Sequence, residues 1–332
     1  MNQSTACPGE SPFFIVGNPR SGTTLLTFIL SSHPRIHIPG ETGFLPQLTK
    51  YNQGQLTPEQ VAEIIRTITR LNRKWRGVVT DEKEFYDALP SHSLACVLDC
   101  LYRLQTQKFN VERWGDKTPS YVRYIPQIAN IFPNAQFIHI IRDGRDSALS
   151  AQKRWGTKKW YMDNYYLLKN WEANVQAGRR AGKNLPPSRY LEIKYEDLVQ
   201  KPREIIEQVC NFLNETFHED MLEHSKLAQK VITPAGHTEV LRPINTRSLE
   251  RWREEMTPFD NKLANALIGQ TLQTFDYPLA DSDSLTALER IKLLILGIRY
   301  QILNLIRVTL YNTGFLTLNR GKQQMKRNNP FR

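Results

Sequence analysis

The stretch Phe13–Leu26 constrains the fold of this chain more than any other part of the sequence. Four apolar residues run into Gly17, a polar turn follows, and apolar residues then recur at helical spacing. This succession predicts a buried strand, a tight loop and a helix, in which Gly17 and Gly22 allow backbone angles that side chains forbid. The first helical amides and the helix dipole favour an anion, and Arg20 adds a charge with bidentate geometry. The loop is therefore predicted to hold a phosphate-like group.

The loop departs at one position from the nucleotide-triphosphatase pattern G-x-x-x-x-G-K-[S/T]. Gly17, Gly22 and Thr24 fit the pattern, but Thr23 stands where the lysine belongs. Because that lysine neutralises charge on the β- and γ-phosphates, its replacement argues against ATP or GTP turnover. An ordinary strand–turn–helix corner without a ligand is the alternative interpretation.

The segment Pro19-Arg20-Ser21-Gly22-Thr23-Thr24-Leu25 resembles the 5′-phosphosulfate loop of sulfotransferases that use 3′-phosphoadenosine 5′-phosphosulfate (PAPS). The residues of this motif are most similar to those of tyrosylprotein sulfotransferases and their bacterial relatives. The resemblance continues, with gaps, from about Phe13 to Pro278. It implies PAPS as co-substrate, a hydroxyl-bearing acceptor and no metal. It also implies that the cofactor is bound by Arg20, Ser21, Gly22, Thr23 and Thr24.

The alternation of apolar strand patterns with helical ones predicts an α/β fold, with a P-loop-like parallel sheet covered by helices on both faces. After the first strand, further strands are expected at Ile36–Ile38, before Pro119, at Gln136–Ile141 and at Arg189–Lys194. We expect a flexible N-terminus over residues 1–12, a sulfotransferase domain over 13–283 with a helical insert at about 51–109, and a basic amphipathic extension over 284–332.

A phosphate clamp is predicted from Arg142, which directly follows a buried strand at the edge where open α/β sheets bind ligands. Ser150 lies eight residues farther on, so that its hydroxyl and the guanidinium could reach one phosphate. Both residues resemble the family's 3′-phosphate motif, and Arg154 matches a further cofactor-binding arginine. The alternative is that Arg142 and Asp143 only cap the following helix.

The resemblance identifies two catalytic candidates. Glu41 matches the family's catalytic glutamate in a Glu-Thr pair after His33-Pro34, where a carboxylate can take the proton of an acceptor hydroxyl. Lys117 matches a lysine near the leaving group, where a cation stabilises charge on the departing oxygens, and Asp116 is expected to orient it. The alternatives are a solvated turn glutamate and a surface ion pair of little energetic weight.

Three further residues match positions that contact the nucleotide in the resembled family. Tyr195 offers an aromatic face that can stack on adenine, and a core tyrosine is the alternative. Asn245 and Arg251 lie in segments that resemble the last cofactor-binding segment of the family.

The chain also departs from the resembled family. Tyrosylprotein sulfotransferases place arginines where this chain has Gly43 and Gln47, which weakens the expectation of an acidic peptide acceptor. A family serine that supports the transition state aligns near His237 and Thr238, and either residue could substitute for it.

The basic charge is concentrated at the C-terminus. Residues Leu285–Arg332 carry +8 of the formal net charge of +11, so a nucleic-acid surface on the main domain is not indicated. Leu285–Leu310 shows helical apolar spacing, and its Lys and Arg residues argue against a transmembrane span. The helix is expected either to dock on the domain or a second subunit, or to lie on an anionic membrane.

The four cysteines include Cys96 and Cys100, one helical turn apart, and none has metal-site spacing. Free thiols in a reducing compartment are expected, with Cys96 and Cys210 packed in the core. Residues 1–12 show no apolar signal core, and the resembled Golgi enzymes carry their anchor there, so we expect a cytoplasmic, prokaryotic protein.

The sequence thus predicts a PAPS-dependent sulfotransferase with an unidentified acceptor: carbohydrate, lipid, small metabolite or tyrosine. Two alternatives stay open. One is a nucleotide-dependent phosphotransferase, which would need Mg²⁺. The other is a catalytically inactive nucleotide-binding regulator peripheral to the membrane.

Overall fold

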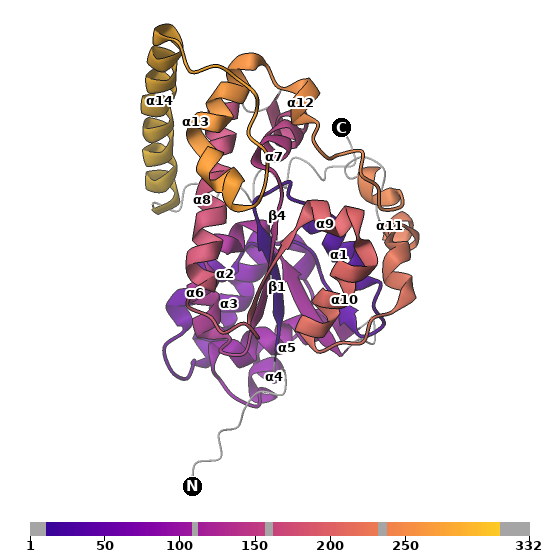
Figure 1. The fold of residues 1–332 in the computed structure, drawn as a ribbon. Helices are drawn as coiled ribbons and strands as arrows, with labels where there is room; N and C mark the ends of the chain where they lie inside the picture. The colour runs from indigo at the N-terminus through magenta and orange to yellow at the C-terminus, as the bar shows by residue number, and fades with distance from the viewer. Residues whose placement is uncertain (1–10, 108–111, 157–161, 232–237, 313–332) are drawn as a thin grey trace, which may run out of the picture. The chain divides into compact units, whose positions relative to one another are not determined.

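The computed structural model describes residues 11–107, 112–156, 162–231 and 238–312 of the 332-residue chain (Figure 1). The chain forms two compact units. The first contains Met1–Arg142 and Asn174–Arg247, and the second contains Asp143–Ala173 and Ser248–Arg332. Each unit is described by itself below.

A five-stranded parallel sheet forms the centre of the first unit. The strands are β1 (Phe13–Gly17), β2 (Ile36–His37), β3 (Arg113–Lys117), β4 (Gln136–Ile141) and β5 (Tyr190–Lys194), in the order β2-β3-β1-β4-β5. All residues of β1 and β4 are buried, as expected for inner strands of a sheet covered on both faces. The predicted α/β fold with a parallel sheet is confirmed.

The register of the inner strands depends on close packing. Phe13 lies opposite Gly115, and its ring occupies the space where a Cβ on Gly115 would stand, at 2.3 Å. In the sheet order, the connection that leaves β1 leads to β2 at one edge of the sheet, and the connection that leaves β4 leads to β5 at the opposite edge. The topological switch point therefore lies between β1 and β4, where open α/β sheets bind ligands beyond the carboxyl ends of the strands.

Helices flank the sheet on both sides (Figure 1). One side carries α1 (Thr23–Ser31), α9 (Tyr195–Gln200) and α10 (Pro202–Leu213). The other side carries α2 (Leu45–Leu48), α3 (Pro58–Leu71) and α6 (Ile125–Ile131). The remaining α-helices that belong wholly to this unit are α4 (Glu82–Asp87), α5 (Leu94–Thr106) and α11 (His224–Val231).

The predicted insert is helical over its described residues, and its helices begin where side chains can cap them. Thr57 and Gln60 form a reciprocal capping box at the start of α3, with Pro58 in the first helical position. Ser93 caps α5 by accepting a hydrogen bond from the amide of Cys96. The short helix α4 was not predicted, because its six residues contain too little periodic pattern.

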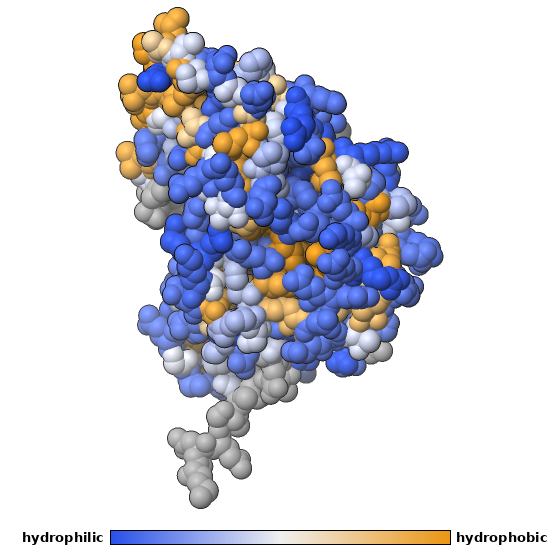
Figure 2. Space-filling model, viewed as in Figure 1, coloured by the Kyte–Doolittle hydropathy of each residue, from blue (hydrophilic) through white to orange (hydrophobic). Residues whose placement is uncertain are grey.

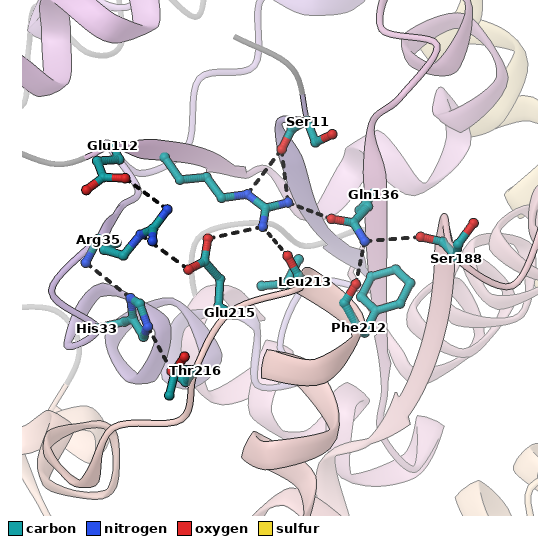
Figure 3. Close-up of polar contacts among 11 residues, drawn as sticks. Ser11, His33, Arg35, Glu112, Gln136, Ser188, Phe212, Leu213, Glu215 and Thr216 are labelled. Carbon is teal, nitrogen blue, oxygen red and sulfur yellow. Dashed lines mark hydrogen bonds and ion pairs between the residues drawn. The ribbon is translucent and has the colours of Figure 1, made fainter.

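The amino ends of the strands are joined by a buried polar network (Figure 3). Arg113 is the first residue of β3. Its guanidinium donates to the carbonyl of Ser11, which lies before β1, at 3.0 Å, and to the Gln136 side chain at 2.5 Å. Gln136 in turn donates to the carbonyl of Ser188, ahead of β5, at 3.1 Å. Arg113 also pairs with Glu215 at 3.3 Å. One arginine thus connects three strand starts with the end of α10.

His33, which lies just after the end of α1, belongs to the same network. Its Nδ1 accepts from the Arg35 amide at 3.1 Å, so Nε2 carries the proton and donates to the Thr216 carbonyl at 2.9 Å. Burial lowers the pKa of His33, which favours this neutral form.

The second unit is helical over its described residues. It contains α7 (Gly144–Ala151), the π-helical turn Gln152–Gly156, the first part of α8 (Asn164–Gly182), α12 (Trp252–Glu255), α13 (Pro258–Thr274) and α14 (Ala287–Asn312). Asp143 caps α7 through the Arg145 amide and also binds the buried Arg145 guanidinium. That guanidinium lies 3.5 Å from the Trp252 ring centroid, so Arg145 stabilises the junction of α7 and α12.

The cysteine prediction was wrong in one respect. Cys96 is buried, as predicted, but it is disulfide-bonded and not a free thiol, whereas Cys100 and Cys210 are free. Within the described parts of the chain, no helix combines the length and apolar character that a membrane crossing needs. The predicted boundaries at residues 12, 283 and 284 stay predictions.

Replacing Arg113 tests the network at the amino ends. We expect Arg113→Met to lower the free energy of unfolding by about 3 kcal/mol, because it removes the donor of the Ser11 and Leu213 carbonyls and one of the two arginines that pair with Glu215. The matched control is Arg203→Met, which removes an exposed arginine that pairs with Glu219 and should barely move the urea midpoint. Equal shifts of the two midpoints would contradict the structural role of Arg113.

Candidate active site

The predicted site residues of the first unit follow the carboxyl ends of adjacent strands. Lys117 ends β3, the phosphate loop follows β1, Arg142 follows β4 and Tyr195 follows β5. Since these four strands are neighbours and parallel, their ends meet at one edge of the sheet. The sheet order therefore explains how residues far apart in the sequence come together.

The phosphate loop is shaped by Gly22, the N-cap of α1. Its φ of 91° is left-handed, and a Cβ there would stand 2.3 Å from the Tyr195 ring. No side chain within the described residues caps α1, and its first intrahelical bond runs from Leu26 to Gly22. The amides of Thr23, Thr24 and Leu25, the first three of α1, therefore make no intrahelical hydrogen bond, and they lie at the positive end of the helix dipole, where an anion is favoured.

Arg20 adopts a φ of 77°, which costs a side-chain-bearing residue about 1–2 kcal/mol. Its carbonyl accepts a hydrogen bond from Arg142 Nη1 at 3.3 Å, and the Arg142 guanidinium lies 4.7 Å from the Tyr195 ring centroid. Arg142 is buried, as are Ser21 and Thr23 in the loop. Arg142 therefore supports the loop from β4, besides being the predicted phosphate ligand.

Glu41 and Lys117 form a hydrogen-bonded ion pair of 2.7 Å between Nζ and Oε1. The Lys117 side chain is 8% exposed and the Glu41 side chain 60% exposed. The Lys117 side chain is therefore buried, and the Glu41 side chain is exposed to solvent. Because an ammonium group has three donors, Lys117 can hold Glu41 and still reach another anion.

The backbone around Glu41 is fixed although its side chain is exposed. The Glu41 carbonyl accepts from the Asn72 side chain at 3.0 Å. The next amide, that of Thr42, donates to Thr118 Oγ1 at 3.0 Å. These two hydrogen bonds therefore hold the backbone that carries the Glu41 side chain.

A buried carboxyl, Asp116, organises these contacts. Thr42 and Thr118 donate to its two oxygens at 2.5 and 2.7 Å, and the Tyr102 hydroxyl, from α5, donates as well. Tyr121 completes the group by hydrogen bonding to Thr42 Oγ1 at 2.8 Å. The expectation that Asp116 orients Lys117 needs correction: these hydrogen bonds go to Thr42, Tyr102 and Thr118, so Asp116 positions the Glu41 loop against β3.

Burial dominates the electrostatics of this group. It raises the pKa of Asp116 to about 6, although the three hydroxyl donors act in the opposite direction. The pKa values of Tyr102 and Tyr121 are raised well above their usual range, first by burial and then by the nearby carboxyl. Both tyrosines thus act as neutral hydrogen-bond donors.

Asn245 and Arg251 each form hydrogen bonds with residues close by in the sequence. Asn245 is half-buried and bonds within its own turn, to the Pro243 carbonyl and the Arg247 amide. In the second unit, Arg251 pairs bidentately with Glu255, Ser150 is half-buried in α7, and Arg154 is exposed in the π-helical turn. His237 and the Thr238 side chain lie outside the described residues.

Sequence reasoning missed Thr42, Thr118, Tyr102 and Tyr121 as supports of the site. Thr42 and Thr118 adjoin the two predicted catalytic residues, so adjacency was an available signal. Tyr102 and Tyr121 offered none, because an aromatic residue in a helical segment is usually core. Across the described residues, no group of three or more His, Cys, Asp or Glu is placed to hold a metal ion.

The chain is similar to known proteins over most of its length. Residues 12–219 match the family model described as "Sulfotransferase family". A putative protein-tyrosine sulfotransferase of Caenorhabditis briggsae is 27% identical over 249 residues, which cover 73% of this chain and 81% of that protein. An uncharacterized protein of Aquifex aeolicus (strain VF5) is 28% identical over 251 residues, covering 74% of this chain and about a third (31%) of that longer protein.

Among solved structures, the sulfotransferase domain from the Synechococcus PCC 7002 olefin synthase is similar in fold, with a TM-score of 0.57 and 23% identity. The alignment covers 82% of this chain and 96% of that one. The family model spans β1 to β5 and thus every strand of the sheet. The family prediction is confirmed: this chain belongs to the sulfotransferase family.

Proposed function

We propose that this protein transfers a sulfuryl group from PAPS to a hydroxyl group of an acceptor. The observation that carries the proposal is the Lys117–Glu41 ion pair at the same sheet edge as the phosphate loop and Arg142. An exposed carboxylate, a buried cation and an anion cradle are the groups that such a transfer needs. Membership of the sulfotransferase family supports the proposal.

The residues of the first unit fit the charges of PAPS. The open amides at the start of α1 and the Arg20 charge suit the 5′-phosphosulfate, and Arg142 suits the 3′-phosphate. Tyr195 would lie beside the adenine, and Asn245 would contact the cofactor from its turn. In the second unit, Ser150, Arg154 and Arg251 are proposed cofactor ligands on the basis of the resemblance. PAPS, when bound, supplies the sulfuryl group and leaves as the 3′,5′-bisphosphate.

Glu41 and Lys117 have different roles in this proposal: one accepts a proton and the other stabilises negative charge. Glu41 accepts the proton of the acceptor hydroxyl as the hydroxyl oxygen attacks. Lys117 holds Glu41 in place before the reaction and stabilises negative charge on the departing phosphate oxygens. Asp116, through Thr42, keeps the Glu41 backbone at a fixed position relative to β3.

The acceptor is proposed only as a hydroxyl group. Tyrosine is the acceptor in the name of the Caenorhabditis briggsae relative. Gly43 and Gln47 stand at the positions where the resemblance places arginines suited to acidic peptides. Screening of carbohydrate, lipid, phenolic and peptide acceptors with sulfur-labelled PAPS identifies the class. Transfer from ATP with Mg²⁺, in the absence of transfer from PAPS, would replace the proposal by a phosphotransferase.

Removing the base tests the role of Glu41. We expect Glu41→Gln to lower kcat by about 100-fold or more, because the amide cannot accept the acceptor proton. Binding of the 3′,5′-bisphosphate, measured by calorimetry, should stay near the wild-type value. The matched control, Glu204→Gln, changes an exposed glutamate of α10 and should leave kcat unchanged. Full turnover by Glu41→Gln would show that another group takes the proton.

Removing the clamp tests Arg142. Arg142→Ala should weaken calorimetric binding of the 3′,5′-bisphosphate by roughly 10- to 100-fold, since it removes charge-assisted hydrogen bonds to phosphate. Arg142→Lys should recover part of the loss because it restores charge without the planar fork. Arg180→Ala removes an exposed arginine of α8 and serves as the control. Wild-type affinity in Arg142→Ala would rule out the clamp.

The raised pKa of Asp116 makes a pH-dependent prediction. The folded state holds this proton more tightly than the unfolded state, so the stabilisation is complete below about pH 4 and is lost as pH rises to about 6. Relative to Asp116→Asn, the wild-type free energy of unfolding should therefore fall by up to about 3 kcal/mol across this window. Urea titrations of both proteins at several pH values measure the two free energies of unfolding. A wild-type value that rises with pH relative to that of Asp116→Asn would contradict the prediction.

A further inference from the structure

Helix α14 is attached to the second unit through one of its faces. Glu289 pairs with Lys262 of α13 at 3.2 Å, and Lys292 lies 3.8 Å from the ring centroid of Phe259. The Tyr300 ring lies 5.9 Å from that of Tyr165, at the start of α8. Arg299 also pairs with Asp163. These contacts extend from the first turn of the helix to its middle, so the first half of α14 is docked on the second unit.

The opposite face of α14 is apolar and exposed. Leu288 is 80% exposed and Leu305 68% exposed, at either end of the stripe. Figure 2 shows the apolar side chains gathered along this helix. The large apolar side chains of α14 that are at least about half exposed are Leu288, Ile291, Leu294, Ile295, Ile298, Ile302, Leu305 and Ile306. A soluble surface rarely presents so many of them in one row.

Basic residues flank this apolar stripe. At 100° per residue, Lys292 and Arg299 lie along one border of the stripe and Arg290 along the other. The acidic Glu289 lies away from the stripe and is paired with Lys262. An apolar centre with basic borders is the arrangement of helices that lie in a lipid–water interface, where long basic side chains extend toward headgroups.

We propose that the exposed face of α14 binds the surface of an anionic lipid membrane, with the helix parallel to that surface. The Leu and Ile side chains would enter the acyl boundary, and Arg290 would contact phosphate groups. The sequence beyond α14 adds five basic residues and no acid, which increases the attraction to anionic lipid. The proposal concerns binding alone and does not depend on sulfuryl transfer.

Charge favours a membrane over a second copy of this chain. Two α14 faces packed together would bring basic borders against basic borders. The single acid of Leu285–Arg332 is Glu289, already paired with Lys262, so it cannot offset that repulsion. An anionic bilayer supplies the missing opposite charge over the whole length of the helix.

Vesicle flotation of the full chain tests the proposal without any acceptor. Wild-type protein should float with vesicles of phosphatidylcholine and phosphatidylglycerol in equal parts, and should remain unbound with phosphatidylcholine alone. High salt should weaken binding, because the electrostatic part is screened. Failure to float with the anionic vesicles would overturn the proposal, whatever the enzymatic activity of the preparation.

Two variants separate the apolar and the charged contributions. Ile298→Ser with Ile302→Ser keeps every charge and should weaken vesicle binding by at least about tenfold. Arg290→Gln keeps the apolar stripe and the Lys292–Phe259 contact, and it should weaken vesicle binding by about fivefold. The control is Gln208→Ser with Asn211→Ser on the exposed face of α10, which should bind vesicles as the wild type does.

Circular dichroism melting should show all three variants folded, because their substituted side chains are exposed. Wild-type vesicle binding by the serine variant of α14 would contradict the role of the stripe. Light scattering gives the second check: a wild-type dimer that becomes monomeric in the serine variant would assign the stripe to a second copy and overturn the membrane proposal.

Discussion

Burying a carboxyl in an apolar core costs several kcal/mol unless hydrogen bonds replace its water, and Asp116 is buried completely. Thr42, Thr118 and Tyr102 replace that water, and each comes from a different segment of the first unit. The requirement to satisfy one carboxyl therefore fixes the loop of the proposed base, the end of β3 and the helical insert relative to one another. Loss of any one donor would leave the others around a poorly solvated group.

The two ends of the sheet have different tasks. At the amino ends, Arg113 and Gln136 connect the strands through fully formed polar contacts, which suits stability. At the carboxyl ends, the first amides of α1 make no intrahelical hydrogen bond and the Glu41 side chain is exposed, which suits ligand binding. A sheet that is rigid at its amino ends, with hydrogen-bond donors at its carboxyl ends, can present a site that is preorganised for the charge that develops during the reaction.

The sequence predicted the elements whose signals are local. The apolar runs of β1 and β4 and the glycine turn before α1 each depend on neighbouring residues. Residue roles that depend on tertiary contacts were harder to predict. Asp116 was assigned to Lys117, its sequence neighbour, because nothing in the sequence shows that Tyr102 and Thr42 converge on it. Alternation along β3 does imply that neighbours 116 and 117 point to opposite faces, so that part of the error was avoidable.

The two interpretations of the C-terminal helix were posed as alternatives, but a helix has two faces. The contacts of Tyr300 and Glu289 attach α14 to the second unit, and these contacts leave the apolar stripe uncovered. Attachment to the protein is also what a membrane-binding helix needs, because a helix held in place loses less conformational freedom when it reaches the lipid. Docking and lipid binding are therefore consistent, and the first strengthens the second.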